Sequence, residues 1–279
     1  MHKVVFPALI GAVLTMSLVG TAQALNTRTW ISGKGTDAAG CGPIASPCRT
    51  LQYAHDNTAS GGEIDVLDPA GYGSVKINRA ISIVNDGVGT AGVLASSGQN
   101  GIEVNTTGAV VLRGLTIEGA GVGRNGIDFL GGDSLTISNC VVQNFAGNDN
   151  YSGVGILLVP ISGTPIITIT NTTVSDNQYI GISYLPTISG SASLTIDRVI
   201  ATRNKVVGIA IYTFNSNGAP AVGSISNSLA SNSITGIQVE GGTFMLDNVQ
   251  AFQNNVGIYI NGTNAQAAFV SIARSTAAN

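Results

Sequence analysis

The sequence has few charged and aromatic side chains and little cysteine or histidine. Of its 279 residues only 10% are charged and 5% are aromatic, and it contains three cysteines and two histidines. The low charge and the 44% share of hydrophobic residues exclude a disordered, self-repelling chain and leave material for a long core. The nearest approach to a basic cluster is Arg198, Arg203 and Lys205. Nucleic-acid binding needs clustered positive charge, so we expect no DNA or RNA partner.

The N-terminal residues differ in character from the rest of the chain. A positively charged start precedes an apolar run at residues 4–19, and small residues follow up to Ala22-Gln23-Ala24. The run is short for a bilayer span, and its A-x-A ending is typical of signal-peptidase cleavage before Leu25. We predict a signal peptide at residues 1–24, with a retained N-terminal anchor as the alternative. No later run is long enough to span a bilayer, so we expect a secreted or periplasmic protein without a membrane contact after cleavage.

The three cysteines lie in different surroundings. Cys41 and Cys48 flank a loop rich in Gly and Pro, and export favours a disulfide between them. Two free thiols are the alternative, and zinc lacks further ligands nearby. Cys140 lies in a strand pattern and is expected to be a buried apolar residue, since no histidine is placed to activate it. His55, the only histidine after cleavage, lies in a short helical segment, where we expect it at the surface.

One motif recurs along the chain: an apolar strand-like triplet ending at Asn or Arg, followed after a variable loop by Gly-Ile. The Gly-Ile pairs begin at positions 126, 155, 181, 208, 236 and 257, so that the period is 21 to 29 residues. Such a period with insertions at fixed places is typical of a solenoid. The 37 glycines and the abundant Asn, Ser, Thr, Val and Ile favour short strands and tight turns over helices.

Each copy holds three strand-like pieces joined by turns too short for crossover helices, so the chain must coil. Stacked coils place each strand about 4.8 Å from its counterpart and line up the inward side chains. We expect a column of isoleucines at positions 127, 156, 182, 209, 237 and 258. Asparagines 139, 171, 227 and 248 are expected at a sharp turn, where left-handed φ is tolerated and their amides can form a ladder. Arg198 is expected to interrupt that ladder.

These turn asparagines and Gly-Ile strands resemble the pectin lyase-like superfamily of right-handed parallel β-helices, over residues 61–279. The resemblance implies an all-β solenoid of about eight coils, the last incomplete. Residues 25–60, with the disulfide loop and a short helix, look like the N-terminal cap of secreted bacterial β-helix repeat proteins. The last strand, Ala268–Ile272, is expected to pack on Thr243–Leu246. Because no cap follows it, we expect self-association through that end.

Enzymes of this superfamily hold their site outside the strand that begins here at each Gly-Ile. Alternation places only two acidic residues there, Asp128 and Glu240, about 19 Å apart, whereas glycoside hydrolysis needs about 5–9.5 Å. The Asn-x-Asp, Asp-Asp and Gly-His-Gly motifs of polygalacturonase-like members are absent. A pectate lyase-like site would use Arg124 as base with Asp128, Asp133 and Asp149 holding Ca²⁺. The alternative is a solvated group of turn residues.

The same outward positions carry a stripe of apolar and aromatic side chains, which favours recognition over catalysis. The stripe consists of Leu130, Leu157, Val159, Leu185, Tyr212 and Tyr259. Neighbouring loops folded over it would bury it. We therefore predict a non-catalytic β-helix, without cofactor or metal, that binds a polysaccharide or a protein surface. The alternative is a polysaccharide lyase or related carbohydrate-active enzyme.

Overall fold

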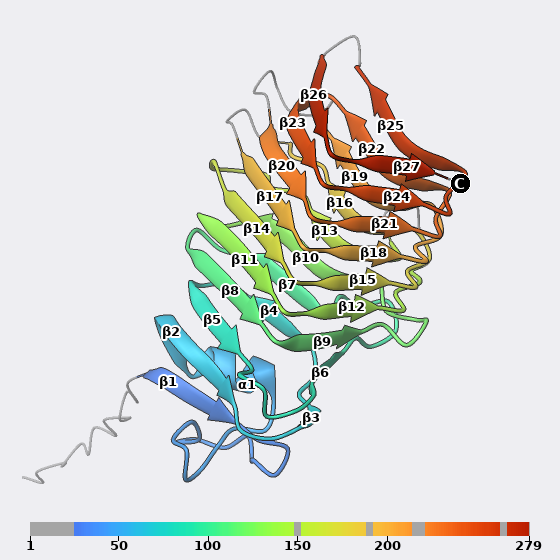
Figure 1. Cartoon of the computed structure of the whole chain (residues 1–279). Coiled ribbons are helices and arrows are strands. Elements are labelled where there is room, and N and C mark those ends of the chain that lie inside the picture. Colours follow the sequence, from blue (N-terminus) through green and yellow to red (C-terminus); the bar gives the residue numbers. More distant parts are fainter. Residues whose placement is uncertain (1–24, 148–151, 188–191, 214–220, 263–266, 279) are drawn as a thin grey trace, which may run out of the picture.

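The chain winds into a parallel β-helix (Figure 1). The computed structural model describes residues 25–278 except 148–151, 188–191, 214–220 and 263–266. In this part of the chain every strand pairing between coils is parallel, and α1 (Leu51–Asp56) is the one α-helix. The all-β solenoid predicted from the repeat is confirmed. The predicted signal peptide lies outside the described residues.

Three sheets run along the solenoid, and each complete coil contributes one strand to each of them. Sheet A contains β1 (Asn26–Ile31), β2 (Thr58–Val66), β5 (Ile81–Val84), β8 (Ala109–Arg113), β11 (Ser134–Ser138), β14 (Ile166–Thr170), β17 (Ser193–Asp197), β20 (Val222–Ser226), β23 (Gly242–Asp247) and β26 (Ala268–Ala273). Sheet B contains β3 (Ala70–Gly71), β6 (Ala91–Leu94), β9 (Leu115–Glu118), β12 (Val141–Gln143), β15 (Thr173–Ser175), β18 (Ile200–Thr202), β21 (Leu229–Ser231), β24 (Gln250–Phe252) and β27 (Thr276–Ala278). Sheet C contains β4 (Val75–Ile77), β7 (Ile102–Asn105), β10 (Asn125–Gly131), β13 (Val154–Leu158), β16 (Ile180–Tyr184), β19 (Val207–Tyr212), β22 (Thr235–Glu240) and β25 (Val256–Asn261). The complete coils run from β2–β4 to β23–β25.

The predicted isoleucine column lies in register on the inner face of sheet C. Ile127 pairs with Ile156 and the pairing continues through each next coil to Ile258. Ile127 to Ile237 are fully buried, and Ile258 packs partly buried against the same core. The core is therefore one continuous apolar cluster that runs the length of the solenoid.

The sharp turn between sheets A and B takes the left-handed conformation that its asparagines favour. Asn227 has φ 49° and Asn248 φ 53°, and Asn248 Nδ2 donates to Asn227 Oδ1 over 2.8 Å. Arg198 interrupts the amide ladder as expected, because Asn227 Nδ2 donates to Asp197 Oδ1 and not to residue 198. Arg198 adopts the same turn with φ 52°, and its Nε donates to Asn171 Oδ1 over 2.7 Å. The long guanidinium side chain thus replaces the amide as donor to the neighbouring coil.

A second ladder lies inside the solenoid and has no counterpart among the sequence predictions. It follows the turn between sheets B and C, where Asn177, Asn204 and Asn254 point inward and are buried. Asn177 Nδ2 donates to Asn204 Oδ1 over 2.9 Å, and Asn204 Nδ2 donates to the Val174 carbonyl over 3.0 Å. These amide side chains form hydrogen bonds with backbone N–H and carbonyl groups at the corner between sheets B and C, for example the Phe145 N–H and the Val174 carbonyl.

The N-terminal segment packs against the first coils of the solenoid. A disulfide joins Cys41 to Cys48, as predicted, and Cys140 is buried, which raises the pKa of its thiol to about 11. The expectation of a surface His55 is wrong, because its side chain is completely buried between α1 and the start of sheet C. No helix in the described ranges is long and apolar enough to cross a membrane.

The last described coil is exposed on the side away from the cap. β26 pairs with β23 from Thr243 to Leu246, which confirms the predicted packing of the last strand. Phe269 is 66% and Ile272 47% exposed. Self-association remains a prediction: we expect sedimentation velocity to show a sedimentation coefficient that rises with concentration for the mature chain. A constant monomer value across the accessible range would contradict it.

Candidate functional site

One row of outward side chains on the outer face of sheet C takes one residue from each coil. The register places Lys76 beside Glu103, and Glu103 beside Asp128. The row then continues as Leu157, Ser183, Ala210, Gln238 and Tyr259. It is ionisable at the N-terminal end. Further along, Ser183 and Ala210 are buried, Leu157 and Gln238 are half-buried, and Tyr259 is exposed.

A polar pocket of about 430 Å³ opens at the ionisable end of this row. Four chain segments line it: α1, the start of β4, the loop before β7 together with that strand, and the residue before β10. The lining residues are Gln52, Ser74, Val75, Lys76, Gly98, Gln99, Asn100, Glu103 and Arg124. A concave pocket with convergent polar groups is the preferred kind of place for a small ligand group to bind.

Asp128 lies behind the lining of this polar pocket. It is only 7% exposed, and Asn100 Nδ2 donates to its Oδ2 over 2.9 Å. Its Oδ1 and the Oδ1 of Asn100 have no hydrogen-bond partner among the described residues. Burial raises the pKa of Asp128, and the negative charge of Glu103 adds to the rise, against the opposing effects of Asn100 and Arg124. The buried carboxyl group is therefore a weaker acid than an exposed aspartate.

Glu103 corrects the sequence prediction about carboxylates on this face. Sequence reasoning paired Asp128 with the distant Glu240, but Glu103 lies beside Asp128 on the adjacent coil, so their Cα atoms are about 4.8 Å apart. The signal was present, because Gly101-Ile102 is a further copy of the Gly-Ile motif and Glu103 follows it. Glu103 Oε2 also lies 3.8 Å from Lys76 Nζ, and Glu103 remains partly exposed.

The residues suggested for a lyase are brought together only in part. Arg124 lines the pocket beside Asn100 and influences the pKa of Asp128, whereas Asp149 lies outside the described residues. Ca²⁺ takes six to eight oxygen ligands. Within the described ranges no group of three acidic, histidine or cysteine side chains could hold a metal ion. The pocket is also lined by two positively charged side chains, Lys76 and Arg124. The described donor set does not fit a calcium site.

The predicted apolar stripe is present on the outer face of sheet C with unequal exposure. Leu157 and Tyr212 are half-buried against a small external cluster of Val154, Ile180, Val207 and Ala210. Burial raises the pKa of Tyr212 to about 12, with a smaller contribution from Glu240. Leu130, Val159 and Leu185 are also partly exposed, and Tyr259 is 42% exposed. Part of the stripe therefore forms external packing, and Tyr259 offers the most accessible ring.

Comparisons with known proteins agree with this architecture. The sequence family described as "Right handed beta helix region" matches residues 93–271. The crystal structure of pectate lyase Pel9A is similar, with a TM-score of 0.63 and 15% identity over 91% of this chain and 79% of that chain. At that identity the likeness shows the fold alone. No curated protein matches the sequence. The family match covers well over half of the chain, which therefore belongs to the right-handed β-helix family.

Proposed function

We propose that the mature protein acts outside the cytoplasm and binds a polysaccharide along the outer face of sheet C. The observation that carries this proposal is the outer face of sheet C, which has the polar pocket at one end and the exposed Tyr259 ring at the other, with the half-buried Leu157 and Tyr212 between them. A sugar polymer presents hydroxyl groups and flat ring faces along its length. The amides and charges of the pocket suit the hydroxyls, and tyrosine rings suit the ring faces. The disulfide and the signal-like N-terminus support export.

The polar pocket favours binding over bond cleavage. A general acid must reach the atom to which it gives its proton. Asp128 has the raised pKa that such an acid needs, but it is buried behind Asn100 and does not line the cavity. Glu103 does line the cavity, beside the ammonium group of Lys76. These contacts suit both residues to holding a ligand or shaping the pocket.

Replacing Tyr259 with Ala is expected to weaken polysaccharide binding about five-fold, because a ring contact contributes roughly 1 kcal/mol. Binding is measured on arrayed uronate polymers and neutral glucans of defined composition. The matched control is Met245→Ala, which removes a side chain of similar exposure (48% against 42%) from the outer face of sheet A. Equal binding by the two variants would remove Tyr259 from the binding face, and no binding to any polymer by the folded protein would reject the proposal.

A carbohydrate-active enzyme is the second candidate, because Glu103 and Asp128 are adjacent and their environments differ. A lyase would release an unsaturated sugar that absorbs in the ultraviolet, and a hydrolase would release reducing ends. Assays with and without Ca²⁺, on the wild type and on Glu103→Gln, test both reactions. Product that disappears in Glu103→Gln would favour this candidate over binding alone.

A further inference from the structure

Helix α1 covers the N-terminal edge of sheet C. β4 is the edge strand of that sheet, and its Val75 N–H donates to the Gly101 carbonyl of the next coil. Backbone N–H groups alternate in direction along a strand, so those of Lys76 and Asn78 point away from the sheet, toward α1. Uncovered, they would form an open edge to which another strand could add.

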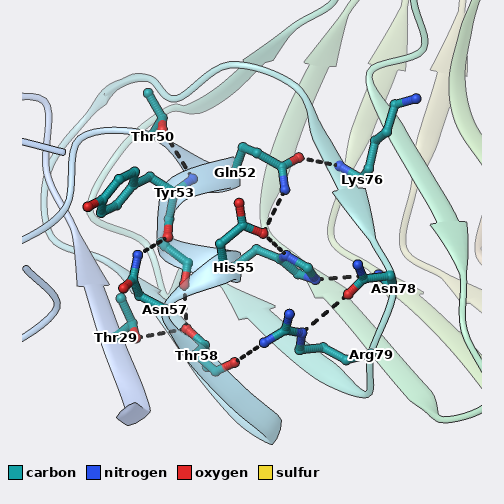
Figure 2. Close-up of polar contacts among 12 residues, drawn as sticks. Thr29, Thr50, Gln52, Tyr53, His55, Asn57, Thr58, Lys76, Asn78 and Arg79 are labelled. Atoms are coloured by element: carbon teal, nitrogen blue, oxygen red, sulfur yellow. Dashed lines mark hydrogen bonds and ion pairs between the residues drawn. The ribbon is translucent and has the colours of Figure 1, made fainter. Parts of the chain in front are cut away.

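Two side chains of α1 accept these edge N–H groups (Figure 2). Gln52 Oε1 accepts from the Lys76 N–H over 2.8 Å, and His55 Nε2 accepts from the Asn78 N–H over 3.4 Å. Residues three apart on a helix share one face, and residues two apart on a strand share one edge, so the two pairs match. Gln52 also lines the polar pocket. The helix that caps the sheet edge thus also forms a wall of the candidate site.

The contacts of His55 determine the protonation state in which α1 can cover the edge of sheet C. We call this arrangement, with both edge N–H groups accepted by Gln52 and His55, the closed cap. A backbone N–H only donates and a carboxylate only accepts, so Nε2 carries no proton and Nδ1 donates to Asp56 Oδ1 over 2.9 Å. Asp56 Oδ1 accepts a second hydrogen bond from Gln52 Nε2 over 3.0 Å. A proton on Nε2 would face the Asn78 N–H donor in a site without solvent. The closed cap therefore requires a neutral His55.

We propose that His55 is a positioning residue whose protonation releases α1 from the edge of sheet C and withdraws Gln52 from the polar pocket. Histidine is the side-chain type that ordinarily gains a charge in mild acid, and a charged ring does not fit the contacts that hold α1 on the sheet edge. The release stands on the cap geometry alone, whereas its effect on ligand binding rests on the proposed function.

Charged residues lie on each of the elements that pack around His55. On its own helix Asp56 accepts from its Nδ1, and the positively charged residues of the adjoining segment are Lys76 on β4 and Arg79 just after it. α1 also packs against β1 and β2, whose charged residues Arg28, Glu63 and Asp65 pair with one another.

Hydrogen exchange of the full mature chain tests the release without a ligand. We expect protection of the Lys76 and Asn78 amides, corrected for intrinsic rates, to fall at least ten-fold from pH 7.5 to pH 5, while Ile156 in the core keeps its protection. Fluorescence of Trp30, the single tryptophan, on strand β1 against which α1 packs, should change over the same range. Unchanged protection and fluorescence in the wild type would overturn the proposal.

Two variants separate His55 from other titrating groups. In His55→Gln the uncharged side chain should abolish the pH dependence, and in Asp56→Asn the loss of the carboxylate should move the transition to lower pH. Asp128→Asn is the control. Burial raises the pKa of Asp128, so its ionisation destabilises the fold as the pH rises, whereas protonation of His55 is expected to release α1 as the pH falls. A transition retained in His55→Gln would overturn the assignment to His55. Polysaccharide binding is measured separately, so its failure would leave the exchange result intact.

Discussion

Replacing Gly208 with Ala is expected to lower the free energy of unfolding by about 3 kcal/mol. A Cβ at this position would lie 2.6 Å from the Gly236 carbonyl oxygen and 3.2 Å from Ala230 Cβ, both in the next coil. The coils cannot move apart to relieve the overlap, because the ladders on all three sheets hold their spacing. Urea denaturation followed by circular dichroism measures the change.

The control for this substitution is Gly71→Ala in β3. Nothing lies within 4 Å of a Cβ placed there, and its φ is not in the left-handed range, so we expect a change within about 0.5 kcal/mol. If Gly208→Ala were as mild as Gly71→Ala, the overlap between coils would not limit stability. The comparison separates steric exclusion from the general effect of glycine on the unfolded chain.

The same overlap explains why the repeat is Gly-Ile. A Cβ on each of these glycines would lie 2.3 to 2.7 Å from the carbonyl oxygen of the equivalent glycine one coil further on. The glycines concerned are Gly126, Gly155, Gly181, Gly208 and Gly236. The motif therefore marks a corner where consecutive backbones approach too closely for any side chain. Sequence periodicity alone reveals the repeat but does not reveal this steric reason.

The architecture could be predicted because its determinants repeat with the chain. One isoleucine per coil and one left-handed residue per turn are enough to set the columns and the corner between sheets A and B. Arg198 shows the limit of this reasoning, since it keeps the turn conformation but replaces the amide contact with a guanidinium contact. A repeat predicts where a side chain lies better than it predicts which group that side chain contacts.

The polar pocket could not be predicted in the same way, because its wall does not repeat. Gln52 comes from the cap helix and Arg124 from the residue before β10, and only the docking of α1 on β4 brings them to one cavity. The sequence prediction put the buried His55 at the surface for the same reason. A short helix with one histidine carries no local sign that its face closes a sheet edge. The contact depends on the register of a strand that lies more than twenty residues further along the chain.

The buried asparagine ladder supports the largest expected loss of stability, in Asn204→Ala. This substitution removes the acceptor of Asn177 Nδ2 and the donor to the Val174 carbonyl, both in the neighbouring coil, and Asn204 is completely buried. Each buried polar group left without a partner costs about 1–3 kcal/mol, so we expect a loss of about 3–5 kcal/mol.

The matched control for Asn204→Ala is Asn227→Gly. Asn227 also bonds to neighbouring coils, through Asp197 and Asn248, but it is exposed, and glycine accepts its φ of 49°. Its loss should cost less than about 1 kcal/mol, because water replaces the missing partners. Urea denaturation of the two variants measures the difference. Equal losses would show that the interior amides contribute no more than surface ones, and that apolar packing alone holds the corner between sheets B and C together.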